Sequence, residues 1–215
     1  MDSSDKPAEY YENTRSEMLK YIPRSVKTVL EFGCGSGYFS ELIKNKYHAE
    51  CWGVEIHSYS AKIASEKLCR VINADAHQAL SEIPDNYFDC IIFNDVLEHL
   101  QDPYSLLLNV KAKLSECGVV VASIPNVRFW SNLKALVIYG TWDYKDTGIL
   151  DKTHLRFFTH KSLIRIFKQL DYSIVAIEGL GPTHSATFKF LNALVLNKFK
   201  DAGYRKFACV VKPNT

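Results

Sequence analysis

The stretch that decides the fold is residues 29–38, which read Val29-Leu30-Glu31-Phe32-Gly33-Cys34-Gly35-Ser36-Gly37-Tyr38. The apolar residues before the first glycine predict a buried strand over 28–32. The three glycines at alternate positions permit positive φ and let a ligand approach the backbone closely. A helix is expected to begin near Ser36, so its free N–H groups point at the same space. The stretch therefore predicts a nucleotide-sized site at the end of the first strand.

Composition limits the classes of protein to which the chain can belong. With 215 residues, 47% of them hydrophobic, the chain predicts a single domain over 1–215. A net charge of +2 argues against a basic nucleic-acid-binding arm, and no apolar run approaches the ~20 residues of a membrane span. The six cysteines lack zinc-type spacing, and nothing at the start resembles a signal peptide. We expect a cytoplasmic monomer or homodimer with no metal site.

Strand and helix patterns alternate along most of the chain. After the strand at 28–32, further strands are predicted at 50–55, 70–73, 88–93, 119–124, 172–178 and 206–212. Helices are predicted at 9–22, within an N-terminal segment 1–23, and then from near Ser36 through at least Lys46, at 58–68, from Asp102-Pro103 to about Leu114, at 161–170 and at 186–199. This alternation predicts an α/β fold with a doubly wound, mostly parallel sheet and helices on both faces.

Residues 126–160 interrupt this alternation. They are rich in aromatic side chains and too long for an ordinary connection. We interpret this stretch, called the cover segment below, as a partly helical cover over the carboxyl ends of the strands, where a substrate would enter.

Polar residues follow the predicted strands where ligands bind in open sheets of this kind. Glu55 ends the second strand, and its carboxylate can accept hydrogen bonds from both hydroxyls of a ribose. This feature alone suits NAD as well as other ligands that contain a nucleoside. A dinucleotide fingerprint, however, requires a glycine where Tyr38 stands, and Glu31 would repel a pyrophosphate. A P-loop is excluded because no Gly-Lys-Ser/Thr follows. A ligand with a ribose at one end and an ammonium group at the other, such as S-adenosylmethionine, fits these residues.

The motifs resemble those of class I S-adenosylmethionine-dependent methyltransferases. Residues 29–37 resemble motif I, residues 53–56 the acidic second motif, residues 73–76 the third, and residues 88–100 the fourth in the form found in ubiquinone-biosynthesis enzymes. The resemblance covers about 10–211. It implies a Rossmann-like sheet of seven strands with the last strand antiparallel, S-adenosylmethionine as cofactor and S-adenosylhomocysteine as product. Residues 124–127 and 148–159 together also resemble a subgroup often encoded near bacterial cell-surface polysaccharide genes.

The resemblance also implies a role for each matching residue. Gly33, Gly35 and Gly37 would line the methionyl part, with Cys34 as part of the turn and not a nucleophile. Glu31 would reach the ammonium group and Glu55 the ribose hydroxyls. The remaining implied cofactor contacts are Ile56 and Ala76 at the adenine, Asp75 at its amino group, Asn94 and Asp95 near the sulfonium, and Tyr11 and Arg15 closing over the cofactor, with Arg15 at the methionyl carboxylate.

The acceptor is expected to be a small polar molecule, and the methylated atom is expected to be oxygen rather than nitrogen. A hydroxyl acceptor needs a base, and histidine titrates nearest neutral pH. The candidates are His154, His99 and His160, with His154 first because it lies in the cover segment. A structural interpretation stands beside this one, in which His154 orders the loop between Asp151 and Phe158. A methyltransferase acting on protein or RNA, and a non-catalytic cofactor-binding scaffold, are the alternative functions.

Overall fold

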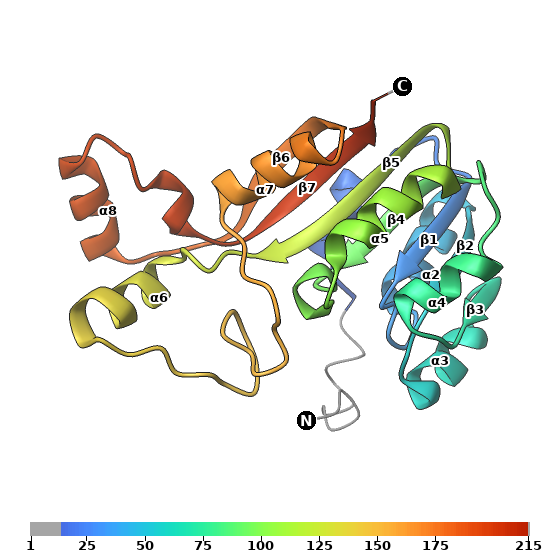
Figure 1. Ribbon diagram of the computed structural model, residues 1–215, viewed down its shortest axis with the longest axis horizontal. Helices are drawn as coiled ribbons and strands as arrows, with labels where there is room; N and C mark the ends of the chain where they lie inside the picture. Colours follow the sequence, from blue (N-terminus) through green and yellow to red (C-terminus); the bar gives the residue numbers. More distant parts are fainter. Residues whose placement is uncertain (1–13, 215) are drawn as a thin grey trace.

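The computed structural model describes residues 14–214 as a seven-stranded sheet with the strand order β3-β2-β1-β4-β5-β7-β6 (Figure 1). The strands are β1 (Thr28–Phe32), β2 (Glu50–Val54), β3 (Arg70–Ile72), β4 (Phe88–Asn94), β5 (Leu114–Pro125), β6 (Tyr172–Pro182) and β7 (Tyr204–Pro213). Pairings from β3 through to β5 are parallel, and β7 is antiparallel to both of its neighbours. The predicted doubly wound, mostly parallel sheet with an antiparallel last strand is confirmed.

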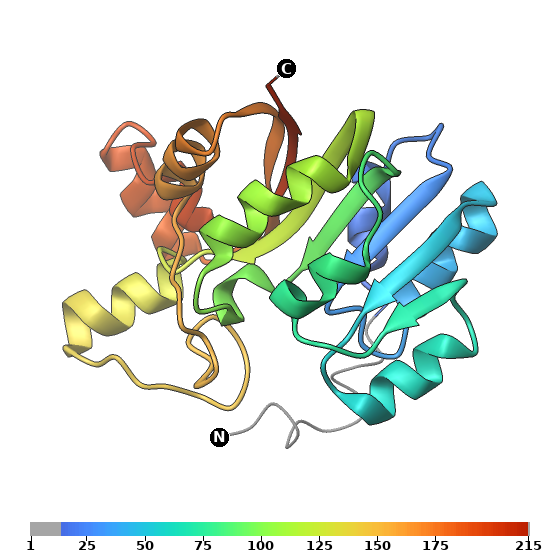
Figure 2. The same cartoon turned by 45° about the vertical axis from the view of Figure 1, so that its right-hand side comes forward.

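Helices cover both faces of the sheet, as Figure 2 also shows. One face packs against α4 (Ala76–Ala79), η3 (Leu80–Glu82), α5 (Pro103–Asn109), η5 (Val110–Lys113) and α7 (His160–Gln169), and the other against η2 (Ser16–Tyr21), α2 (Tyr38–Tyr47) and α3 (Ser58–Ser65). The alternation of side chains along β1 divides the core accordingly. Leu30 and Phe32 join the cluster that contains Leu106 of α5, whereas Val29 joins the cluster that contains Phe39 of α2.

The order of the strands places a crevice at β1. Chain order reverses there, because β1 pairs with β2 on one side and with β4 on the other. In open sheets, ligands bind at such a reversal, beyond the carboxyl ends of the strands. The glycine turn follows β1, so it lies at that position.

Two predicted helices begin differently in the structure. The predicted helix over 9–22 is wrong in its described part, because Ser16–Tyr21 is a 3-10 helix preceded by Arg15 at φ 43°, a left-handed backbone that breaks an α-helix. The rest of that prediction, with Tyr11, lies outside the described residues. The helix expected near Ser36 begins at Tyr38 because Gly37 has φ 81°.

Two other boundaries also differ from the predictions. Leu114 was assigned to the helix after Pro103, but it begins β5 and pairs with Phe88, so β5 runs through Gly118. Helix α8 (Ala186–Leu194) ends five residues before the predicted end at Phe199, since Leu196 and Asn197 both have positive φ.

The cover segment has two differently placed parts. Helix α6 (Trp130–Lys134) and the π-helix η6 (Ala135–Tyr139) extend away from the sheet on the same side as α8, as both ribbon views show. The chain then returns, and the backbone N–H groups of Leu155 and Arg156 donate to the carbonyl of Glu98 at 2.8 and 3.0 Å. The returning part thus packs at the end of β4, on η4 (Leu97–His99). No helix in the described range 14–214 is both long and apolar enough to cross a membrane.

Candidate functional site

The glycine turn has a backbone that side chains would obstruct. Gly33 has φ 64°, and a Cβ atom on it would lie 2.6 Å from Cγ2 of Val96. Gly35 and Gly37 also have positive φ, 54° and 81°. Cys34 packs its Sγ over Gly53, where an added Cβ would lie only 2.5 Å away, and burial raises the pKa of its thiol well above the usual value. Cys34 therefore fills the turn as a small apolar group.

Glu31 is a buried carboxylate beside this turn. It is 2% exposed, accepts from Ser40 Oγ at 2.7 Å through Oε2, and accepts from Asn94 Nδ2 at 3.0 Å through Oε1. Burial raises the pKa of Glu31 to about 7, against the opposing effect of these two donors and of Arg15. The other polar atom of Asn94, Oδ1, is buried and has no hydrogen-bond partner. The pair therefore presents acceptor atoms suited to a ligand that donates hydrogen bonds.

Arg15 and Asp95 lie at the same edge of the sheet. Asp95 follows β4 with φ 55°, and its carboxylate forms an ion pair with Arg15. Lys206 of β7 contacts the same Oδ2 atom at 2.5 Å, and Ser123 donates to Oδ1 at 3.1 Å. The structure thus places Arg15 near Glu31 and Asp95. Lys206 was not among the predicted site residues, because the sequence does not reveal that β7 inserts between β5 and β6.

Glu55, at the end of β2, is tied to the glycine turn. Its Oε2 accepts from the N–H of Gly35 at 2.8 Å, and its Oε1 accepts from the N–H of His57 at 2.8 Å. Ile56 beside it is 58% exposed, which is unusual for isoleucine and leaves an apolar surface next to the turn. Asp75 caps α4 by accepting from the N–H of His77 at 2.8 Å, and Ala76 is the first residue of that helix.

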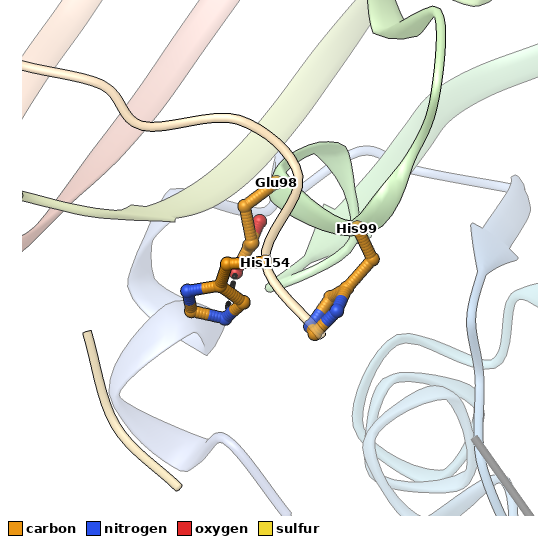
Figure 3. Close-up of side chains that lie close together, drawn as sticks. All are labelled: Glu98, His99 and His154. Carbon is orange, nitrogen blue, oxygen red and sulfur yellow. Dashed lines mark ion pairs between the residues drawn. The ribbon is translucent and has the colours of Figure 1, made fainter. Parts of the chain in front are cut away.

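Two of the three candidate histidines meet at the end of β4 (Figure 3). The rings of His99 and His154 have centroids 4.7 Å apart in an edge-to-face arrangement. His154 Nδ1 lies 2.9 Å from the carbonyl oxygen of Ile149, and its Nε2 lies 4.0 Å from Oε1 of Glu98. His160 is separate from this pair: it is the first residue of α7 and its ring contacts Phe207.

Burial shifts the pKa values of both His99 and Glu98. Desolvation lowers the pKa of His99 to about 4, helped by neighbouring His154, so the ring is neutral at pH 7. Desolvation raises the pKa of Glu98 well above its usual 4.5, and the nearby Asp95 adds to this effect. The carboxyl group of Glu98 lies in the interior and faces a histidine that is far away in the chain, so the sequence alone did not indicate it as a site residue.

Comparison with known proteins agrees with this geometry. Residues 6–177, well over half of the chain, match the family described as "Methyltransferase domain". A malonyl-[acyl-carrier protein] O-methyltransferase of Paenibacillus sp. (strain JDR-2) is 30% identical over 101 residues, which are 43% of this chain and 37% of that protein. A ubiquinone biosynthesis O-methyltransferase of Nitrosomonas europaea is 28% identical over 118 residues, which are 53% of this chain and 50% of that protein. The aligned regions thus span about a third to a half of these relatives.

The fold also resembles that of solved methyltransferase structures. The crystal structure of a SAM dependent methyltransferase from Archaeoglobus fulgidus superposes with a TM-score of 0.69 at 23% identity, covering 97% of this chain and 96% of that one. The family match extends over the glycine turn and over the polar ends of β1, β2, β3 and β4. The chain therefore belongs to the methyltransferase domain family and has the class I fold of S-adenosylmethionine-dependent methyltransferases.

Proposed function

We propose that this methyltransferase transfers the methyl group of S-adenosylmethionine to a hydroxyl group of a small polar acceptor. Two relatives of low identity are named O-methyltransferases, which supports oxygen as the methylated atom. The motif resemblance of residues 148–159 supports an acceptor in cell-surface polysaccharide or related metabolism. The near-neutral net charge of +2 does not favour an RNA substrate.

The buried pair of Glu31 and Asn94 is the observation that carries the proposal. Both Oε atoms of Glu31 are acceptors in a nearly dry site, and Asn94 Oδ1 beside them has no donor. A buried acceptor without a donor costs free energy, which a ligand's N–H groups can recover. The ammonium group of the methionyl part supplies such N–H groups together with a positive charge, so the residues present fit this end of the cofactor.

Other residues would hold the rest of the cofactor. Glu55 would accept hydrogen bonds from the ribose hydroxyls, exchanging its contact with the turn for a contact with the ligand. The exposed side chain of Ile56 would pack on the adenine ring, with Asp75 and the N–H of Ala76 at its edge. Arg15 would attract the methionyl carboxylate, since it already lies near this end of the site.

The chemistry is a displacement at the methyl carbon. A lone pair of the acceptor oxygen forms the new bond to carbon while the carbon–sulfur electron pair stays on sulfur, releasing S-adenosylhomocysteine. Positive charge is dispersed and not created, so holding the two reactants in line and excluding water supply much of the acceleration. The acceptor's proton must leave, and His154 and His99 are the candidate bases because they lie where the cover segment returns to the sheet.

A cavity under the cover segment offers a place for the acceptor. It has a volume of about 420 Å³, and its lining combines apolar residues with polar ones, the latter including Asn132, Asp143, Lys145 and Arg205. Ile149 also lines it, and the carbonyl of Ile149 is the group that holds His154. His154 does not line the cavity itself, but it contacts Ile149, which does, and this proximity supports the cavity as a place for the acceptor.

The test is to measure S-adenosylhomocysteine release with matched hydroxyl and amine acceptors, sugars and phenols among them. We expect release with a hydroxyl acceptor and none with its deoxy analogue. Calorimetry with S-adenosylmethionine alone is run in parallel. Tight cofactor binding without release from any acceptor would favour the scaffold alternative, and salt-dependent retention of RNA on a filter would favour an RNA substrate.

A further inference from the structure

Three side chains with metal-ligating atoms converge at the end of β4. Glu98 and His99 come from η4, and His154 comes from the returning part of the cover segment (Figure 3). One ligand atom from each residue lies within 4.8 Å of the other two. Around an ion bound at about 2 Å, ligand atoms lie about 3–3.5 Å apart, so side-chain movements of about 1 Å would complete the site.

Glu98 supplies an independent reason to expect a cation. Its side chain is 1% exposed, and neither Oε1 nor Oε2 has a hydrogen-bond partner. Among the buried side-chain atoms of residues 14–214, these two and Asn94 Oδ1 are the three without a partner. A buried carboxylate without donors is costly, and native proteins seldom retain one unless something else binds it. A cation between Glu98 and the histidines would provide the missing partner.

The histidines are held in the manner of metal ligands. The carbonyl of Ile149 accepts the hydrogen bond from His154 Nδ1, so Nε2, the atom that faces Glu98, is the ring nitrogen that would bind an ion. His99 Nδ1 lies 3.2 Å from the carbonyl and 3.1 Å from the hydroxyl of Thr153, and that hydroxyl donates to Asp151. A metal-bound histidine usually donates its other N–H to a carbonyl or similar acceptor, which fixes the ring.

Two imidazoles and one carboxylate form a donor set that suits zinc and related divalent ions, whereas magnesium prefers oxygen atoms alone. Asp95, three residues earlier, is a poor additional ligand because Arg15 and Lys206 already neutralise it. Three protein ligands leave at least one coordination position for an exogenous oxygen. The site is also formed only when the cover segment lies against η4, since that segment supplies His154.

We propose that Glu98, His99 and His154 bind a divalent transition-metal ion of the zinc class, which holds the acceptor's hydroxyl oxygen. The second part rests on the proposed function. A hydroxyl bound to such an ion loses its proton to water more readily, so neither histidine has to accept it. The oxygen pair then forms the O–CH3 bond, the carbon–sulfur pair stays on sulfur, and the charges balance with one proton released to solvent.

The binding test uses the full chain after dialysis against a chelator. Cobalt is added and its visible absorption is followed, and zinc is then used to displace it. We expect one ion per chain, with the affinity lowered by at least about tenfold in Glu98→Gln and in His154→Gln. His160→Gln is the matched control, because this histidine is the last residue of the cover segment but lies outside the cluster. Absence of saturable binding, or equal affinity in His154→Gln and His160→Gln, would overturn the site.

Two further measurements separate this inference from the proposed function. Glu98→Gln keeps the size and shape of the buried side chain, so without metal it should melt close to the wild-type temperature, whereas zinc should raise the melting temperature of the wild type and not that of Glu98→Gln. Metal binding without S-adenosylhomocysteine release from any hydroxyl acceptor would retain the site and overturn hydroxyl methylation. Unchanged release after metal removal would overturn the link between the ion and the acceptor.

Discussion

Replacing Glu31 by glutamine should make the protein more stable and a poorer binder of its cofactor. The change keeps the shape of a side chain that is 2% exposed but removes its ionisation. Glutamine can still accept from Asn94 through oxygen, and its amide can donate to the hydroxyl of Ser40. The variant therefore isolates the cost of keeping a charge at this position.

The magnitude follows from the pKa of Glu31, which burial raises from the usual 4.5 to about 7. Between these two pH values the folded protein holds a proton that the unfolded chain has lost, so the free energy of unfolding falls as pH rises through this window and levels off above it. The difference corresponds to about 3 kcal/mol, at about 1.4 kcal/mol per pH unit. The hydrogen bonds to the carboxylate are already included in this pKa, but the glutamine amide obliges Ser40 to accept where it donated; allowing about 1 kcal/mol for this exchange leaves a gain of about 2 kcal/mol above about pH 8.

The assay is thermal or urea unfolding of wild type and Glu31→Gln at about pH 4.5 and about pH 8.5. For a chain of this length, about 2 kcal/mol raises the melting temperature by about 4–8 °C at the higher pH, with no gain at the lower. The exposed Glu116→Gln is the control and should stay within about 0.5 kcal/mol of wild type at both. A Glu31→Gln variant that is less stable than wild type at about pH 8.5 would refute the reasoning.

Four other outcomes are expected for the site and the segment that covers it. Cofactor affinity should fall about tenfold per pH unit below pH 7, because the ammonium group needs the ionised form of Glu31; a flat calorimetric profile from pH 5 to 8 would contradict this. Glu55→Gln should weaken cofactor binding by about 1–3 kcal/mol. The one remaining side-chain oxygen would then have to serve the N–H groups of Gly35 and His57 as well as the ribose hydroxyls. Unchanged affinity by calorimetry would show that Glu55 is not part of the site. His154→Ala should slow methyl transfer with little change in cofactor affinity, and a normal rate would leave it a loop-ordering role. Residues 126–160 should exchange amide hydrogens more slowly when cofactor and acceptor are bound, so mass spectrometry showing equal exchange would argue against a cover.

The core of the fold could be predicted from the sequence because its signals are local. The apolar run 28–32 followed by alternate glycines specifies a strand, a turn and a helix, and the structure has all three. Boundaries were less predictable where pairing overrides helix preference. Leu114 suits the apolar stripe of a helix, yet it becomes part of β5 because Phe88 pairs with it.

The site was predictable only in part, for a similar reason. Glu31 and Glu55 follow strands, so sequence position alone placed them at the same edge. The burial of Glu98 depends on contact with His154 in a segment that is remote along the chain, and no sequence periodicity links the two. The described structure also separates His160 from the other histidines, which the spacing of the residues could not reveal.

The carboxylate of Asp95 joins regions from opposite ends of the polypeptide, since Arg15 precedes the first strand and Lys206 belongs to the last. In shortened versions of the protein that keep the glycine turn but omit β7, Asp95 would lose its ion pair with Lys206 and retain only Arg15. Asp95 directly follows Asn94, so the change in charge would occur beside that residue. Deletion or permutation designs for this enzyme should therefore retain residues 204–213, even though they are distant in sequence from every cofactor motif.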